Sequence, residues 1–281
     1  MSTLFAEEIT LTEEDFRCVS QIVYDHCGIN LHDGKKELIR ARLAKKLRAG
    51  GFRSFSEYME HLSSDSSGKE FSSFIDVLST NLTSFFRERQ HFEYLQNQLL
   101  PRLVEKKSRH NQFRLRAWSA GCSSGEEPYS IAITLLDNLP RGRWDTKILA
   151  TDISTRILEK AKAGTYAAER IEPVAVPQRN KYLVMKKSNG HKQYEVAECL
   201  REIIVFRYLN LMEEWPIQGP LDFIFCRNVM IYFDKPTQAM LVKRFFNLLD
   251  SGGVLFTGHS ESLTGIDHEF KYIQPTIYMK G

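Results

Sequence analysis

Several features that mark particular protein classes are missing from this 281-residue sequence. No apolar run approaches the roughly 18 residues that a membrane-spanning helix needs. The N-terminal stretch Met-Ser-Thr-Leu-Phe-Ala-Glu-Glu has neither the basic start nor the apolar core of a signal peptide. There are no internal repeats and no low-complexity segment. We therefore expect a cytoplasmic globular protein with no membrane insertion and, from its length, about two domains.

Cysteine is sparse and is not arranged for metal binding. The sequence has no CxxC pair and no Cys/His cluster. We expect reduced thiols and no metal site. The net charge of +3 is too small to indicate a nucleic-acid partner by itself. The five cysteines are Cys18, Cys27, Cys122, Cys199 and Cys226.

A GxGxxG phosphate loop is also missing from the stretch around which the chain is organised. Residues 113–120 predict a buried strand, residues 121–125 a turn of small residues, and Pro128 suits the first turn of a helix. Such strand–turn–helix units bind nucleotide-like ligands in α/β proteins. Here the helix opens with Glu126 and Glu127, which would repel a phosphate. We expect a ligand that is cationic or carries hydroxyl or amino groups.

The first 80 residues have the pattern of a small bundle of four short helices. Thr12 with Asp15, and Ser54 with Glu57, are helix-start signals. The second helix, from about residue 34 to 49, is strongly basic. Two explanations remain open: a solvated helix face, or a docking surface for an acidic protein helix or a nucleic acid. The docking interpretation assigns Arg40, Arg42, Lys45, Lys46, Arg48 and Arg53.

Downstream, strands and helices alternate, as in a doubly wound α/β domain. A helix from Arg89 to about Lys107 is broken or restarted at Pro101. Asp152 ends the second strand, where such folds bind ribose hydroxyls, although it would equally cap the following helix. An Asn189-Gly190 turn indicates a hairpin, and we expect an inserted antiparallel β-subdomain at about 181–206. Strands are expected at 113–120, 147–152, 202–211, 221–229 and 254–258, with a closing antiparallel pair at 270–273 and 276–279.

Four motifs stand out: Asn-Leu-Thr-Ser-Phe-Phe-Arg-Glu (81–88), Gly-Glu-Glu-Pro-Tyr-Ser (125–130), Ala-Thr-Asp-Ile (150–153) and Cys-Arg-Asn-Val-Met-Ile-Tyr-Phe (226–233). With these motifs the chain resembles the CheR family, the chemotaxis receptor glutamate O-methyltransferases, from about Leu11 to its end. The resemblance implies an N-terminal helical substrate-docking domain (1–80) and a linker contributing to the cofactor site (81–88). It also implies a Rossmann-like S-adenosylmethionine-dependent methyltransferase domain (89–281).

The resemblance also implies an activity. The enzyme would methylate glutamate side chains on the cytoplasmic helices of membrane chemoreceptors, giving methyl esters and S-adenosylhomocysteine. S-adenosylmethionine carries an amino group, a sulfonium, a ribose and an adenine but no phosphate, so the acidic helix start fits it. Carried over by motif, the cofactor site comprises Asn81, Thr83 and Arg87 from the linker, Glu127 at the cofactor's polar end, Asp152 at the ribose, Asn210 and Leu211 near the adenine, and Arg227 and Asn228 on the methionine side.

The implied reaction makes modest chemical demands. A glutamate carboxylate, with a free pKa of about 4.3, is already ionised at neutral pH and needs no general base. The leaving group departs as a neutral thioether, so no general acid is needed. In-line positioning remains, and Arg87 and Tyr232 are the candidate catalytic residues that orient the carboxylate.

Two other functions compete with this interpretation. A nucleic-acid methyltransferase would be expected to show a base-stacking motif and a stronger net charge, and neither is visible. A non-catalytic cofactor-binding signalling module is disfavoured by the joint presence of Arg87, Asp152 and Tyr232. We expect a monomer. Some CheR proteins tether a receptor C-terminal peptide through the β-subdomain; because the turn at 187–193 has a single glycine, we expect no such tether here.

Overall fold

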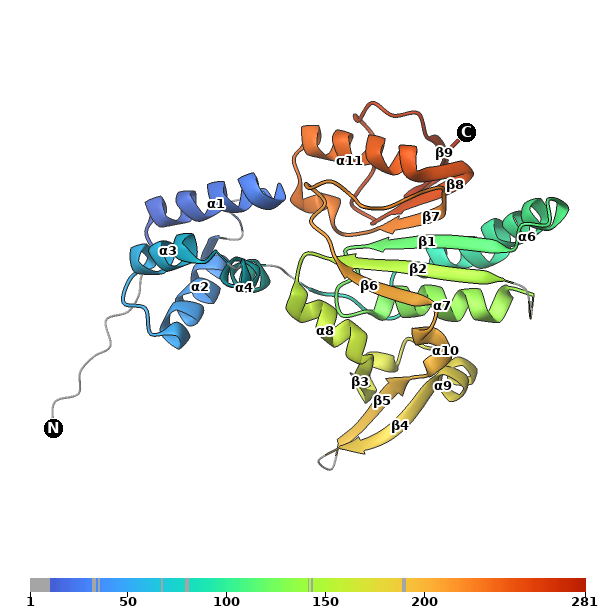
Figure 1. Cartoon of the computed structure of the whole chain (residues 1–281), viewed down its shortest axis with the longest axis horizontal. Helices are drawn as coiled ribbons and strands as arrows, with labels where there is room; N and C mark the ends of the chain where they lie inside the picture. The colour runs from blue at the N-terminus through green and yellow to red at the C-terminus, as the bar shows by residue number, and fades with distance from the viewer. Residues whose placement is uncertain are drawn as a thin grey trace. The chain divides into compact units, whose positions relative to one another are not determined.

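The computed structural model describes residues 11–31, 34, 36–66, 68–78, 81–140, 142, 144–188 and 191–281. The chain divides into two compact units, Met1–Thr80 and Asn81–Gly281 (Figure 1). Among the described residues, none of the helices combines the length and apolar character needed to cross a bilayer.

The secondary structure described in the first unit is helical. Thr12 caps α1: its side chain accepts the Asp15 N–H at 3.1 Å, and the Asp15 carboxylate accepts the Thr12 N–H at 2.8 Å. Ser54 caps α3 by accepting the Glu57 N–H at 3.1 Å. Both predicted helix starts are therefore confirmed. The described helices are α1 (Glu13–Cys27), α2 (Lys36–Gly50), α3 (Phe55–Ser64) and α4 (Lys69–Leu78).

Three of the basic residues on α2 make contacts inside this unit. An Nη of Arg40 lies 2.7 Å from Glu13 Oε1. Arg42 donates to the Leu78 carbonyl at the end of α4 at 3.2 Å. Lys46 lies 2.9 Å from the Glu70 carboxylate. These three therefore help to hold the helices together, while Lys45, Arg48 and Arg53 are exposed.

The second unit is built on a sheet of seven strands in the order β6-β2-β1-β7-β8-β10-β9. Neighbours pair in parallel from β6 to β8, whereas β10 pairs antiparallel with both β8 and β9. Chain order reverses beside β1, which places a topological switch point between β1 and β7. The doubly wound sheet with an antiparallel finish is confirmed. Its strands are β1 (Arg114–Ala120), β2 (Asp145–Asp152), β6 (Ile204–Tyr208), β7 (Leu221–Cys226), β8 (Leu249–Thr257), β9 (Lys271–Gln274) and β10 (Ile277–Met279).

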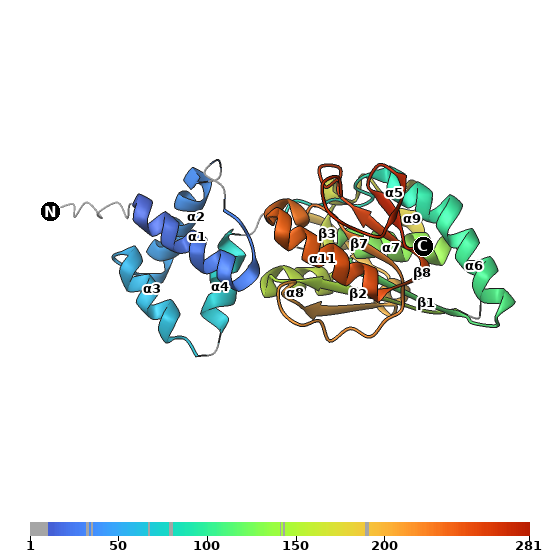
Figure 2. The same cartoon turned by 90° about the horizontal axis from the view of Figure 1, so that it is seen from above.

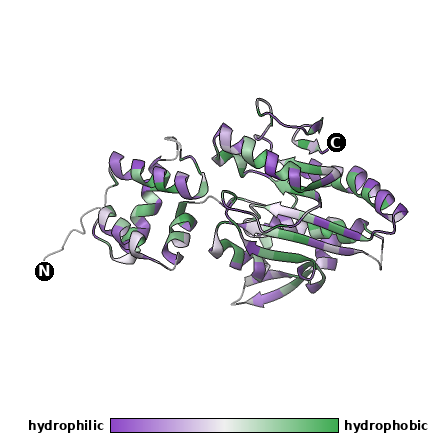
Figure 3. Ribbon diagram, turned by 45° about the horizontal axis from the view of Figure 1, so that its top comes forward, coloured by the Kyte–Doolittle hydropathy of each residue, from purple (hydrophilic) through white to green (hydrophobic). Residues whose placement is uncertain are grey.

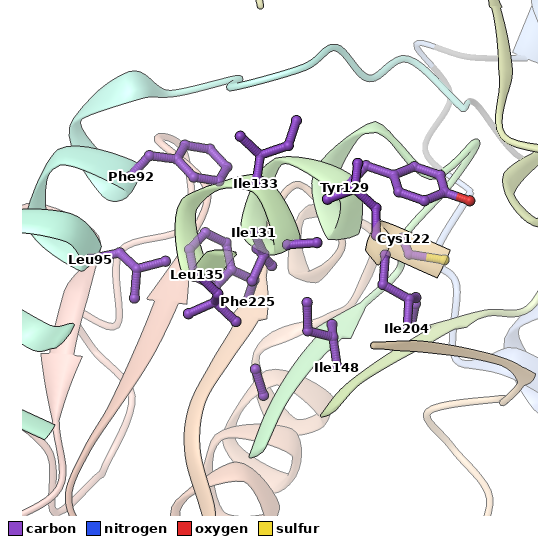
Figure 4. Close-up of a cluster of buried hydrophobic side chains, with 14 of the residues drawn as sticks. Phe92, Leu95, Cys122, Tyr129, Ile131, Ile133, Leu135, Ile148, Ile204 and Phe225 are labelled. Atoms are coloured by element: carbon purple, nitrogen blue, oxygen red, sulfur yellow. The ribbon is translucent and has the colours of Figure 1, made fainter. Parts of the chain in front are cut away.

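Apolar side chains cover both faces of this sheet. On one face, Ile131 and Leu135 of α7 pack with Phe92, Ile148 and Phe225 in a single buried cluster (Figure 4). On the other, Trp118 packs 5.5 Å from Phe245 of α11, measured between ring centroids. Hydrophobic residues gather along the strands and polar ones on the outer turns of the helices (Figure 3). Burial on both faces explains the nearly continuous apolar runs of the central strands. The longer helices of this unit are α6 (Leu100–Arg109), α7 (Glu126–Asn138), α8 (Thr155–Ala163) and α11 (Lys235–Leu248).

The segment before β1 is helical throughout and contains a π turn. It consists of α5 (Arg89–Tyr94), the π segment η2 (Leu95–Leu99) and α6, with Pro101 in the first turn of α6. The wider π turn comes directly before the proline, so the helix continues past Pro101. The α-helical segment α6 restarts there, but the predicted break is absent. Figures 1 and 2 both place α6 at the end of the sheet where β1 begins.

The antiparallel β-subdomain exists, but its extent differs from the predicted 181–206. It is a sheet in the order β3-β5-β4, made of β3 (Thr165–Ala167), β4 (Leu183–Ser188) and β5 (His191–Val196). The strand after it, β6, instead pairs in parallel with β2 in the large sheet, because its alternating apolar residues are buried there. The predicted Asn189-Gly190 turn lies outside the described residues. We call β3, β4, β5, η3 (Ala168–Ile171) and α9 (Val176–Tyr182) the β-lobe.

Candidate active site

The loop between β1 and α7 requires glycine at two positions. Gly121 has φ 79°, and a Cβ there would lie 2.3 Å from a methyl of Val229, in the loop after β7. Gly125 has φ 97°, and a Cβ there would lie 2.8 Å from the Tyr166 hydroxyl. The loops that leave β1 and β7 therefore meet at the switch point, where this fold class binds its ligands.

A buried ion pair joins those two loops. Arg227 Nε donates to Glu127 Oε2 at 2.8 Å, and the Ser119 hydroxyl donates to Glu127 Oε1 at 2.7 Å. Glu127 and Arg227 are 7% and 5% exposed, so the pair is held in a low-dielectric setting. Glu127 is thus more than a first-turn acid favoured by the helix dipole: it fixes the α7 start to the end of β7.

The other side of the Arg227 guanidinium faces α5 and the residues that come directly before it. Its Nη1 donates to the Arg87 carbonyl at 2.6 Å and to His91 Nδ1 at 3.1 Å. The ring of Phe92 lies 5.4 Å and that of Phe225 5.2 Å from the guanidinium carbon. Arg227 is therefore positioned by carboxylate, carbonyl, imidazole and aromatic contacts together.

His91 is fully buried and neutral. Burial, followed by the charge of Arg227, lowers its pKa to about 3. Its Nδ1 accepts from Arg227, so the proton lies on Nε2 and is donated to the Thr276 hydroxyl at 2.7 Å. That hydroxyl donates in turn to the Pro275 carbonyl at 2.6 Å. This chain of bonds fixes the imidazole tautomer.

Arg87 is held by neutral acceptors. One Nη donates to the Leu82 carbonyl and the other to Asn228 Oδ1, both at 2.8 Å. Among the described residues it has no carboxylate partner, so its charge stays uncompensated. Asn228, which has φ 59°, donates from its amide nitrogen to Glu88 Oε1 at 3.1 Å. The structure thus brings Arg87, Glu127, Arg227 and Asn228 into one connected network.

Asp152 ties the loop after β2 to the loop after β1. Its Oδ2 accepts the Ser123 N–H at 2.8 Å and its Oδ1 the Ser154 N–H at 2.9 Å. The side-chain cap of α8 is Ser154, which accepts the Ile157 N–H at 3.1 Å. The N-cap residue of α8 is therefore Ser154 and not Asp152.

The remaining predicted site residues differ in their burial and in their contacts. Asn210 is buried after β6, where its Oδ1 accepts the Met212 N–H at 3.1 Å. The carbonyl of Leu211 accepts from Trp215 Nε1 at 3.1 Å and from Arg244 at 2.8 Å. Three predicted site residues, namely Asn81, Thr83 and Tyr232, are half-buried.

Sequence reasoning noted Glu126 at the helix start without assigning it a contact, and it missed three other residues that shape these loops, namely Tyr166, Arg170 and Glu261. Glu126 is fully buried, pairs with Arg170 of η3, and accepts from the Ser124 hydroxyl at 2.6 Å. The Tyr166 hydroxyl of β3 donates to the Ser124 carbonyl at 2.7 Å. Glu261 lies buried after β8. The small polar run Gly258-His-Ser-Glu at the end of a predicted strand was the available signal for Glu261.

The site fits a cofactor that is rich in hydrogen-bond donors and has no phosphate. The Ser123 hydroxyl is buried without a hydrogen-bond partner among the described residues, as expected of a group awaiting a ligand. Nearby carboxylates belong to Glu127 and Asp152, which suit amino and hydroxyl groups. The part of the chain that the structure describes contains no group of three or more His, Cys, Asp or Glu side chains arranged for a metal.

Comparison with known proteins agrees with this geometry. Residues 14–79 match the family model "CheR methyltransferase, all-alpha domain", and residues 81–279 match "CheR methyltransferase, SAM binding domain". The chain is 41% identical to the chemotaxis protein methyltransferase of Borreliella burgdorferi, covering 99% of this chain and 98% of the relative. It is 42% identical to chemotaxis protein methyltransferase 2 of Pseudomonas aeruginosa (97% and 95%) and 39% identical to the Escherichia coli chemotaxis protein methyltransferase (97% and 92%). The chain therefore belongs to the CheR methyltransferase family, and its second unit is the family's S-adenosylmethionine-binding methyltransferase domain.

Proposed function

We propose that this methyltransferase transfers the methyl group of S-adenosylmethionine to glutamate side chains of membrane chemoreceptors. The observation that carries this proposal is the Arg87 guanidinium, which is held by two neutral acceptors and faces no carboxylate of its own among the described residues. A cation fixed in place with its charge uncompensated suits an anionic substrate. The paired Arg227, by contrast, is committed to Glu127.

Cofactor binding is assigned to the loops at the switch point. Glu127 and Asp152 would accept from the amino group and the ribose hydroxyls. Asn81, Thr83, Asn210, Leu211, Arg227 and Asn228 would complete the site. When bound, S-adenosylmethionine supplies an electrophilic methyl group on a positively charged sulfur.

Arg87 and Tyr232 would orient the glutamate carboxylate for attack. A carboxylate oxygen forms the new bond to the methyl carbon while the carbon–sulfur bond breaks, and its electron pair stays on sulfur. The negative carboxylate becomes a neutral ester and the positive sulfonium becomes a neutral thioether, so the step requires no proton transfer. Well-oriented reactants can lower such a barrier by roughly 7–11 kcal/mol. The arginine contacts to Leu82 and Asn228 hold the guanidinium in place without the full strength of a carboxylate pair, which leaves it able to position the substrate.

The receptor helix would dock on the first unit. Since Arg40, Arg42 and Lys46 are engaged within the unit, this proposal rests on Lys45, Arg48 and Arg53, which are exposed. An acidic stretch of receptor helix is the partner that such a surface would attract.

Methyl transfer to receptor-rich membranes tests the proposal. Label from S-adenosylmethionine should enter the receptor and be released as methanol by mild base, because carboxyl methyl esters hydrolyse under those conditions. Arg87→Met should abolish this labelling, while Arg89→Met, at an exposed neighbouring position, should leave it unchanged. Label that resists mild base, or that enters added nucleic acid instead, would reject glutamate methylation.

A further inference from the structure

The carboxylate of Glu261 binds three backbone N–H groups of two different loops. Its Oε2 accepts from Asn228 N at 2.7 Å and from Gly258 N at 2.5 Å, and its Oε1 accepts from Ile231 N at 3.0 Å. Glu261 lies in the loop after β8 and is only 5% exposed. A buried side chain that gathers three main-chain donors fixes the path of the chain around it.

Two of those donors, Asn228 N and Ile231 N, belong to the turn after β7, which carries two residues assigned to the reaction. Asn228, which accepts from Arg87 and donates to Glu88, begins it, and Tyr232 ends it within the 3-10 turn η4 (Met230–Tyr232). Asn228 adopts φ 59°, a conformation that costs free energy for a side-chain-bearing residue. The N–H bond to Glu261 helps to hold that conformation. Without it, the turn would lose a main-chain anchor directly beside Arg87.

The packing around the carboxylate leaves no room for adjustment. A Cβ on Gly258 would lie 2.7 Å from both Asn228 N and Glu261 Oε2. The side chain therefore approaches the two backbones as closely as a glycine allows. Burial raises the pKa of the Glu261 carboxyl, and the backbone N–H donors of Gly258, Asn228, Ile231 and Val229 oppose that rise. These donors need acceptors, so the ionised form with two acceptor oxygens matches the site.

We propose that Glu261 is a positioning residue for methyl transfer: its carboxylate sets the turn that presents Asn228 to the cofactor and Tyr232 to the glutamate carboxylate. It acts through the backbone of residues 228–231 and touches neither reactant. The proposal rests on the proposed function for its kinetic consequence, but its structural consequence can be measured without any substrate.

Glu261→Gln is the informative change, because it keeps the size of the side chain. An amide offers one acceptor oxygen, so its NH2 group must face either Ile231 N–H or the Asn228 and Gly258 N–H groups. The matched control is Asp222→Asn. Asp222 is an equally buried carboxylate near the start of β7, the strand that leads into the turn at 228–231. It accepts the Arg116 N–H at 2.8 Å and pairs with Lys107 at 2.7 Å.

Hydrogen exchange of the full chain gives the first readout. In the wild-type protein the amides of Asn228 and Ile231 should exchange slowly. In Glu261→Gln, peptides that cover residues 227–233 should exchange at least tenfold faster, whereas Asp222→Asn should leave them protected. Unchanged protection in Glu261→Gln would overturn the proposal whether or not the protein methylates receptors.

Kinetics give the second readout. With cofactor and receptor saturating and at a temperature well below both melting points, Glu261→Gln should lower kcat on the order of 10- to 100-fold, as misplacement of reacting groups by about 1 Å does. Asp222→Asn should lower Tm but keep kcat. Equal kcat for both variants would reduce Glu261 to a stabilising residue. If the wild-type protein labels no receptor, the proposed function fails, and the exchange result still decides the role of Glu261.

Discussion

Each oxygen of the Asp152 carboxylate accepts a backbone N–H, Oδ2 from Ser123 and Oδ1 from Ser154. Under the proposed function the residue has two roles: it holds the loops after β1 and β2 together, and its charge accepts from a ribose hydroxyl. Separating the two roles requires a change that keeps one of them.

Two substitutions of Asp152 should therefore weaken cofactor binding to different degrees. Asp152→Ala should weaken S-adenosylhomocysteine binding through loss of a charge-assisted contact of roughly 1.5–3 kcal/mol. Asp152→Asn keeps an acceptor and should fall between Ala and wild type. Calorimetry gives the affinities, and the melting temperature of each variant without ligand reports the structural part. Wild-type affinity in Asp152→Ala would remove this residue from the site.

His91 should make the stability of the second unit depend on pH. Its folded pKa of about 3 lies below the unfolded value of about 6.5. Between these values the unfolded chain binds a proton that the folded chain does not, so stability is lost as pH falls below 6.5. From pH 7 to pH 5 this loss amounts to about 2 kcal/mol.

Urea unfolding at pH 5, 6 and 7 measures the effect. The three tryptophans, Trp118, Trp144 and Trp215, all lie in the second unit, so their fluorescence reports on that unit alone. His91→Gln keeps an acceptor for Arg227 but cannot titrate. Its free energy of unfolding should therefore decrease much less between pH 7 and pH 5 than that of the wild type. His259→Gln, at an exposed position nearby, should keep it. The same drop in wild type and His91→Gln would show that other groups cause it.

Single residues differ in how far the sequence reveals them. Glu127 and Asp152 could be singled out from the sequence, because each stands in a local motif, Glu127 at a helix start and Asp152 at the end of a strand. The partner of Glu127 was not, since Arg227 lies 100 residues away in the sequence and only the β1–β7 switch point brings the two together. Local spacing cannot report a contact that depends on sheet order.

At the level of elements, the β-lobe contacts the loop between β1 and α7 and the start of α7. Tyr166 of β3 donates to the Ser124 carbonyl, and Arg170 of η3 pairs with the buried Glu126. Both partners belong to the loop and helix start between β1 and α7. The lobe therefore helps to shape the loop to which we assign cofactor binding in the proposed function.

Removing the Tyr166 hydroxyl should loosen that loop. Tyr166→Phe loses one hydrogen bond, a net cost of about 1 kcal/mol, and should weaken S-adenosylhomocysteine binding about threefold to fivefold. Tyr129→Phe is the matched control, since its buried hydroxyl donates at 2.9 Å to the Ala161 carbonyl in α8. Both should lower Tm by similar amounts, but only Tyr166→Phe should change the affinity. Equal affinities in the two variants would mean that the lobe does not shape the cofactor loop.

The outer strand of the lobe gives a second test. β4 lies at the edge of its sheet, with Val184 54% and Met185 50% exposed. An exposed edge can add a peptide as a further strand. The single glycine of the turn nevertheless leads us to expect no tether, and titration with isolated receptor C-terminal peptides should show no binding at micromolar concentration. Micromolar binding that disappears in Val184→Glu/Met185→Glu would prove this expectation wrong.

The extent of the lobe shows where sequence patterns stop. The sequence predicted the two hairpin strands, and β4 and β5 do pair antiparallel. The three-residue β3 is too short to produce an alternating pattern, and it joins the lobe only through pairing with β5. The predicted end of the lobe was wrong. The alternation of apolar and polar residues in β6 would suit a strand of either sheet, and it is the parallel pairing with β2 that places β6 in the large sheet.

For the molecule as a whole, charge is distributed differently between the two units. The chain carries a net charge of only +3, yet α2 of the first unit concentrates basic residues. Some of these are used inside the bundle, and Lys45, Arg48 and Arg53 are exposed. Composition alone could not separate the two groups, because a basic residue that pairs across helices and one that faces water look alike in sequence.

Reversing exposed charges on α2 should weaken receptor use without affecting the cofactor. Lys45→Glu/Arg48→Glu should lower kcat/KM for receptor roughly tenfold at low salt, since each exposed ion pair contributes little but two attractions become repulsions. The difference from wild type should shrink as salt is added, because charges are screened within about 10 Å at 0.1 M and about 3 Å at 1 M. S-adenosylhomocysteine affinity should not change. Arg17→Glu/Lys69→Glu, at exposed positions on α1 and α4, alters the net charge equally and should retain most of the activity. Equal losses in both double variants would indicate a general effect of net charge, and full turnover in Lys45→Glu/Arg48→Glu would identify α2 as a solvated helix face.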